Sequence, residues 1–299
     1  MSDSEQPYYV PKSSKWPIIA ALGLFMLAIG AATCFHGDSY GPYILSGGIL
    51  LTICMMVGWF GAVIHESQSG LYNMQTDRTF RWGMFWFIFS EIMFFAGFFG
   101  ALFYVRNYTL PWLGGEGAVN KLGTHEFLWE GFKAHWPLLN NPNPQQFPNP
   151  VQAMAPLWLP LINTMVLLTS SVTITIAHYC LIDNKRRLLN IMLATTIALG
   201  MGFLCLQAFE YHEAYTVYKM GLNSGIYGTT FFMLTGFHGA HVTIGSIMLI
   251  AILIRCFKGH FTPEHHFAFQ ASAWYWHFID VVWLGLFIYV YVLPLQPNI

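Results

Sequence analysis

Seven stretches of about twenty mostly apolar residues divide this chain of 299 residues. Each is long enough to cross the hydrocarbon core of a bilayer as an α-helix, whereas a membrane β-strand needs only about 9–11 residues. A helix also satisfies all of its own backbone hydrogen bonds in lipid. The sequence therefore predicts an all-α membrane protein with seven transmembrane helices, at 16–35, 43–64, 82–105, 157–181, 188–209, 228–254 and 268–293.

The scarcity of charge excludes other classes of protein. Only 9% of the residues are charged and 55% are hydrophobic, whereas a soluble domain carries about 25% charged residues. So little charge cannot cover a globular surface. The formal net charge of −1 also argues against nucleic-acid binding, which needs concentrated basic surface.

Turn-forming and charged residues set the expected segments. The longest break contains NNPNPQQFPNP and should be an irregular loop. We expect an inner polar N-terminal segment (1–15), the first two helices (16–64), an inner loop (65–81), the third helix (82–105), a long outer loop (106–156), the last four helices (157–293) and an outer C-terminus (294–299).

The distribution of Lys and Arg predicts the orientation. With the N-terminus inside, the inner segments hold nine of the thirteen Lys and Arg residues, and three of the other four lie in or beside the long loop, where charge counts least. The positive-inside rule then places the N-terminus in the cytoplasm or matrix and the C-terminus outside.

A few ionisable residues fall at membrane depth, where each costs on the order of 2.5–3.5 kcal/mol on insertion scales. Glu91 lies ~15 Å beyond Arg81 at ~1.5 Å per residue, near the midplane. The others are in the sixth and seventh predicted helices and at the outer end of the fifth: His238, His241, His277, Asp280, Glu210 and His212.

Four interpretations of these residues are open. The i, i+3 pair His238 and His241 could ligate a metal or haem; Glu91 with His277 and Asp280 could relay protons; the set could form a transporter's substrate site; or the groups could bond across helices and fix their packing. No further ligand stands near the two histidines, and the five cysteines are scattered and unpaired. We therefore expect no metal and no catalytic residue here, a proton-linked or structural role for Glu91, and a structural pair of His277 and Asp280.

Cations gather at the predicted inner end of the sixth helix and just before the seventh. They are Arg255, Lys258, His260, His265 and His266. Arg255 and Lys258 are three apart, so both could reach one lipid phosphate at the membrane surface. Alternatively, these cations only flank the helix ends on the inner side, as the positive-inside rule describes.

Five segments together resemble subunit III of haem–copper cytochrome c oxidase, in order over about residues 10–295. They are RWGMFWFIFSEIMFFAGFFGALF, LINTMVLLTSSVTITIAHY, LQAFEYHEA, GIYGTTFFMLTGFHGAHVTIG and HFTPEHHFAFQASAWYWHFIDVVWL. The long 106–156 loop with PWLGGEG is similar to the bacterial aa3-type form, which favours a bacterial plasma membrane, with the C-terminus periplasmic, over the mitochondrial inner membrane.

The resemblance implies a fold and a function. Two helices stand apart from five and form a V-shaped cleft that holds phospholipids. The complex reduces O2 with electrons from cytochrome c and pumps protons. Subunit III supports proton uptake and the stability of subunit I, and the haem and copper lie in its partners, subunits I and II.

The resemblance also assigns residues. Glu91 matches the family's carboxyl in the third helix, and Glu66, Arg255, Lys258, His265 and His266 match the lipid-headgroup neighbourhood. Gln270 stands where the family usually has Glu, and His65 stands where Arg often precedes the Glu66 position, which weakens a headgroup contact there. An autonomous proton or solute transporter and a haem-binding membrane cytochrome remain as alternative functions.

Overall fold

A computed structural model describes residues 9–10, 13–116 and 124–295. Parts of the predicted N-terminal segment, long loop and C-terminus lie outside these residues. The described part is helical, without strands, and seven of its helices are long and apolar enough to cross a membrane. The prediction of an all-α membrane protein with seven spans is therefore confirmed. The chain divides into two compact units, residues 1–83 and 84–299.

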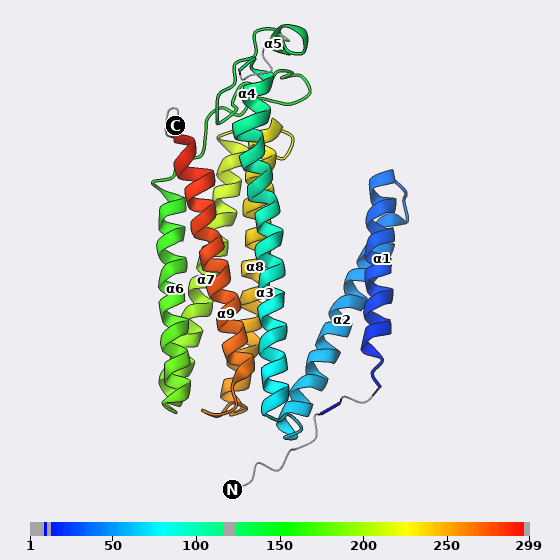
Figure 1. Cartoon of the computed structure of the whole chain (residues 1–299), viewed down its shortest axis with the longest axis vertical. Coiled ribbons are helices and arrows are strands. Elements are labelled where there is room, and N and C mark those ends of the chain that lie inside the picture. Colours follow the sequence, from blue (N-terminus) through cyan, green and yellow to red (C-terminus); the bar gives the residue numbers. More distant parts are fainter. Residues whose placement is uncertain (1–8, 11–12, 117–123, 296–299) are drawn as a thin grey trace. The chain divides into compact units, whose positions relative to one another are not determined.

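The first unit contains a helical hairpin, α1 (Trp16–His36) and α2 (Gly41–Gln68), with its helices packed on one another (Figure 1). Proline in the first turn of each helix suits positions whose N–H has no helical partner. Gly37 ends α1 with a φ of 81°, a left-handed conformation that favours glycine. Small residues line the seam, as is usual where helices pack in lipid.

The helix α3 (Met74–Tyr104) begins earlier than the predicted span 82–105. Its first turns carry Asp77 and Arg81, whose carboxylate and Nε are 2.7 Å apart in an i, i+4 pair. Such pairs support a helix beyond the apolar stretch. The connection from α2 is consequently only residues 69–73, shorter than the predicted inner loop.

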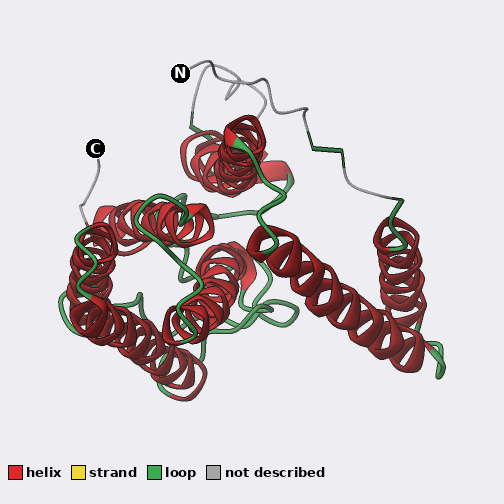
Figure 2. Ribbon diagram, turned by 90° about the horizontal axis from the view of Figure 1, so that it is seen from below, coloured by secondary structure: helices red, strands yellow, loops and turns green. Residues whose placement is uncertain are grey.

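The second unit contains the rest of α3 and four long helices, α6 (Leu159–Ile182), α7 (Arg186–Thr216), α8 (Gly225–Phe257) and α9 (Phe267–Leu286). Figure 2 shows the helices end-on. The most buried of the seven spans is the one that contains α9. Its indoles bond to α6: Trp276 Nε1 donates to Ser170 Oγ and Trp283 Nε1 to Thr164 Oγ1, both at 2.9 Å.

Short elements occupy the segments between and after the long helices. The π-helix η1 (Val105–Thr109) and α4 (Leu110–Leu113) continue α3, and α5 (Thr124–Phe127) lies in the long loop, whose residues 128–156 form no helix or strand. After α9 come the π-helix η3 (Phe287–Val292) and the 3-10 helix η4 (Leu293–Leu295). The Arg106 Nη2 donates to the Leu293 carbonyl at 3.4 Å, which ties η1 to the first residue of η4.

Candidate functional site

The helices α3 and α8 bring Glu91 and His241 together. Glu91 Oε2 lies 2.7 Å from His241 Nε2, and His241 Nδ1 lies 2.6 Å from the Phe237 carbonyl oxygen one turn earlier. A carbonyl only accepts, so Nδ1 carries a hydrogen. The bond between Nε2 and Glu91 then holds one proton, which is either on a neutral carboxylic acid or on an imidazolium paired with a carboxylate.

The surroundings of this pair are aromatic. The rings of Phe95 and Phe94 lie 4.9 and 5.8 Å from the His241 ring, and that of Tyr275 lies 6.5 Å away. The Glu91 side chain keeps 22% of its surface exposed and that of His241 12%. The pair is therefore largely desolvated, and its carboxyl reaches the surface of the second unit.

His238 lies in different surroundings from His241. It is wholly buried, its ring lies 5.2 Å from that of Trp283 and 5.5 Å from that of Phe203, and neither nitrogen has a hydrogen-bond partner among residues 9–10, 13–116 and 124–295. The two histidines thus contact different groups although they are three residues apart. His241 already has both nitrogens engaged, which leaves no free donor for a metal.

His277 in α9 bonds to two hydroxyls of α6. Thr175 Oγ1 donates its hydrogen to the Ser171 carbonyl, so it accepts from His277 Nε2 at 3.3 Å. In the neutral ring, Nδ1 then accepts from the Ser171 hydroxyl at 2.8 Å. Asp280 Oδ2 lies 3.7 Å from that same nitrogen. A nucleophilic triad needs the hydroxyl and the carboxylate on opposite nitrogens, so this arrangement joins helices and does not activate the serine.

The cationic residues lie at the end of α8 and in the turn that follows. Arg255 is stacked on Phe261, with its guanidinium carbon 4.4 Å from the ring centroid, and Lys258 caps the end of α8. Burial, then the charges of Arg255 and Lys258, lowers the pKa of His260. The backbone N–H of His265 donates to Thr262 Oγ1 at 3.0 Å, and His266 Nδ1 donates to the Thr262 carbonyl at 3.2 Å.

In the first unit, Glu66 accepts a hydrogen bond from the Tyr72 hydroxyl at 2.9 Å. Burial and this bond raise the pKa of Tyr72 well above its usual value. The tyrosine therefore stays a donor, and Glu66 already has one partner within its own unit.

Sequence reasoning missed several partners of the predicted residues. Ser171 and Thr175 hold His277, Tyr72 holds Glu66, and Tyr291 lies beside Glu210. The sequence contained a weak indication of Ser171 and Thr175, since hydroxyl side chains spaced i, i+4 share one helix face.

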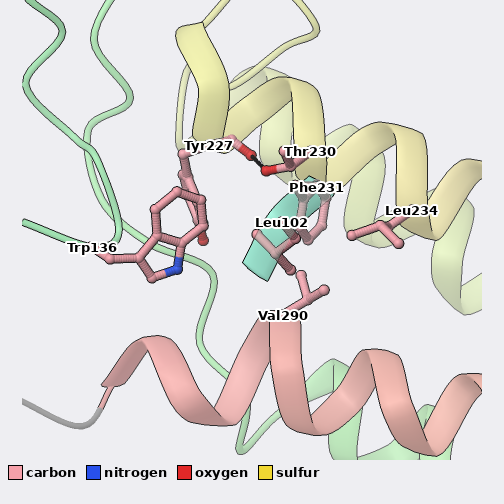
Figure 3. A pocket seen from close by; sticks show the side chains of 7 residues that line it. All are labelled: Leu102, Trp136, Tyr227, Thr230, Phe231, Leu234 and Val290. Carbon is pink, nitrogen blue, oxygen red and sulfur yellow. Dashed lines mark hydrogen bonds between the residues drawn. The ribbon is translucent and has the colours of Figure 1, made fainter. Parts of the chain in front are cut away.

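A small cavity in the second unit is unsuited to a cofactor. Its volume is about 10 Å³, and Leu102, Trp136 and Val290 are among its walls (Figure 3). The one hydrogen bond drawn there joins the Thr230 hydroxyl to the Tyr227 carbonyl of the same helix. A cavity of that volume has room for about one water molecule.

Fold and geometry together define a multi-pass helical membrane protein with an acid–histidine pair inside its second unit. A family model described as "Cytochrome c oxidase subunit III" matches residues 6–116 and 128–294. Similar proteins named cytochrome c oxidase subunit 3 come from Hippopotamus amphibius (39% identical), Pan troglodytes (40%) and Rattus norvegicus (40%), each over 292 residues that cover 97% of this chain and 98% of the relative. The chain belongs to the cytochrome c oxidase subunit III family, and the resemblance is confirmed.

Proposed function

We propose that this chain is the non-redox subunit III of a proton-pumping terminal oxidase, which reduces O2 to water with electrons from cytochrome c. In this proposal it binds subunits I and II, supports proton uptake and the stability of subunit I, and holds structural phospholipids. The Glu91–His241 pair carries the proton-linked part of the proposal.

One proton can move between the two groups of the pair without a change in the pair's net charge. Transfer between Glu91 Oε2 and His241 Nε2 needs movement across a single 2.7 Å hydrogen bond. His241 Nδ1 is bound to the Phe237 carbonyl, so exchange with water takes place at the partly exposed Glu91 carboxyl. Intramembrane acid–histidine pairs of this kind are typical of proton-transfer sites.

Glu91→Gln tests this role in the assembled oxidase. The side-chain amide of this variant can still donate to His241 Nε2, so the variant keeps the hydrogen bond but cannot titrate. We expect normal assembly and oxygen reduction, with a modest loss of proton pumping or sustained turnover at alkaline pH. Glu264→Gln, on an exposed turn, is the matched control.

Two results would contradict the proposal. Pumping and turnover like those of the wild type would make Glu91 purely structural. Complete loss of oxygen reduction in a normally assembled variant would place the subunit in the catalytic core.

We also propose that the haem and copper of the complex lie in subunits I and II. Within the described residues, no three His, Cys, Asp or Glu side chains are grouped as a metal site would require. Metal analysis and a visible spectrum of the purified chain are the tests. A stoichiometric metal or haem that is lost on His241→Ala would contradict this.

The lipid proposal rests on the cations at the end of α8. The Arg255 Nε is buried and has no hydrogen-bond partner among the described residues, and Lys258 is exposed nearby in the sequence. Replacing both with Gln should lower the amount of tightly bound anionic phospholipid measured by mass spectrometry. The control removes two other predicted inner-face cations, Lys185 and Arg187, and should leave the lipid unchanged. Equal lipid in both double variants would count against the site.

The proposed location is a bacterial plasma membrane, with the N-terminus in the cytoplasm and the C-terminus in the periplasm. The charge distribution and the length of the outer loop support it. The phospholipid cleft implied by the resemblance stays a prediction.

A further inference from the structure

A second intramembrane carboxyl, Glu210 of α7, is wholly buried, and no salt bridge to it is found within the described residues. Neither of its oxygens has a hydrogen-bond partner in the described structure. The Tyr291 hydroxyl and a second acid, Glu213, both interact electrostatically with it. An ionised carboxylate in this position would be isolated from any compensating charge.

Tyrosines surround this carboxyl, and the hydroxyl nearest to it is unpaired. Tyr211 is already bonded to Thr235 at 2.7 Å, and Tyr227 accepts from the Met154 backbone N–H at 3.2 Å. Tyr291 is buried, interacts electrostatically with Glu210 and completes no hydrogen bond among the described residues. It lies in η3, the π-helical stretch in which the consecutive residues Val290 and Tyr291 are both buried.

Asn163 of α6 adds two more unpaired polar atoms. It is wholly buried, and neither its amide oxygen nor its nitrogen has a hydrogen-bond partner in the part of the chain that the structure describes. Asn163 lies near Leu159, the first residue of α6. Glu210 lies near Thr216, the last residue of α7. These two helices are packed together and joined by only residues 183–185, so they run antiparallel and place both side chains toward the same membrane face.

Unpaired buried polar atoms of this kind bind ordered water in folded proteins, typically with about three hydrogen bonds for each water molecule. The Trp283 ring lies 5.2 Å from the His238 ring and 6.1 Å from the Tyr291 ring, so it contacts both residues.

We propose that Glu210, Tyr291 and Asn163 form an internal water-binding site in which Glu210 is a protonated carboxylic acid. The acid donates to water or to the tyrosine, and the amide and phenol hold the same water group. Glu213, one turn nearer the outer end of α7 and only half-buried, provides the route by which this proton exchanges with the outer solution. The proposal does not depend on the role of Glu91.

Infrared difference spectroscopy of the assembled oxidase tests whether Glu210 is protonated and whether its proton exchanges with solvent. The wild-type minus Glu210→Gln spectrum should contain the carbonyl band of a protonated carboxylic acid, and that band should move to lower frequency after equilibration in D2O. The control, wild type minus Glu264→Gln, should contain carboxylate bands instead. Carboxylate bands for Glu210, or an acid band that D2O does not move, would overturn the proposal.

Two further variants keep the carboxyl and remain informative if Glu210→Gln fails to assemble. Tyr291→Phe and Asn163→Leu each remove one hydrogen-bonding group from the site. Each should shift the acid band relative to wild type because the hydrogen bonding of the carboxyl changes. An acid band unmoved in both variants would show that Glu210 does not share water with these residues.

Discussion

The hydrogen bond between Glu91 and His241 joins residues of α3 and α8 that are far apart in the sequence. Both were singled out from the sequence as ionisable groups at membrane depth, but His241 was grouped with His238 because of their spacing. The pairing with Glu91 depends on which faces of two long helices meet, and almost every residue around Glu91 in α3 is apolar. Composition could locate the residue but could not identify its partner.

A double-mutant cycle measures the strength of this bond. Glu91→Ala and His241→Ala should show a coupling energy of about 0.6–1.7 kcal/mol, the range found for side-chain hydrogen bonds between membrane helices. The readout is unfolding of the purified chain in detergent. Glu91→Gln should retain most of the coupling because its amide donates to the same nitrogen. Additive single-variant effects would contradict the bond.

His260 gives a pH-dependent prediction outside the membrane spans. Its pKa is lowered in the folded chain, so the unfolded chain binds more protons near its usual value of 6.5. Stability should therefore fall as the pH drops through that value, and His260→Gln should reduce the fall. Arg255→Gln should raise the His260 pKa toward normal in an NMR titration. A pKa at or above 6.5 in the wild type would contradict this.

At the scale of elements, the seven helices followed from length and apolarity alone, because lipid leaves the backbone few alternatives. Their ends were less predictable. The start of α3 carries a supporting ion pair that lies outside the apolar stretch, and the π-helical stretches η1 and η3 leave no mark in the hydropathy pattern. The η3 stretch has a consequence for function, since it contains the Tyr291 that faces Glu210.

The α1–α2 hairpin depends on close backbone approach. A Cβ added at Gly30 would collide with the Leu45 backbone, and one at Gly48 would lie 2.8 Å from the Leu27 nitrogen. Gly30→Ala should therefore destabilise the hairpin by about 1–3 kcal/mol, the usual cost of overpacking. Gly61→Ala in α2 meets nothing within 4 Å and is the control. Thermal unfolding of the two variants should differ; equal midpoints would show that the helices can separate without cost.

At the scale of the whole molecule, many of the exposed side chains are large and apolar. Exposed side chains include Phe25, Val57, Trp86, Met165 and Ile247. In water such a surface would aggregate, whereas in a bilayer it faces acyl chains. Membrane insertion was therefore predictable from composition. The direction of insertion depends on a few charges at the helix ends.

Orientation can be tested with an impermeant thiol reagent on intact cells. Nine of the thirteen Lys and Arg residues fall in segments predicted to be inside, so Ser13→Cys should be protected and Gln145→Cys, exposed in the long loop, should be labelled. Both substitutions belong in a Cys34→Ser background, because Cys34 is a free thiol near the predicted outer end of α1. Permeabilised cells provide the control, in which both positions should react. Labelling of Ser13→Cys but not Gln145→Cys in intact cells would show that the topology is the reverse of the predicted one. The cations at the end of α8 would then face the periplasm and not the anionic inner leaflet.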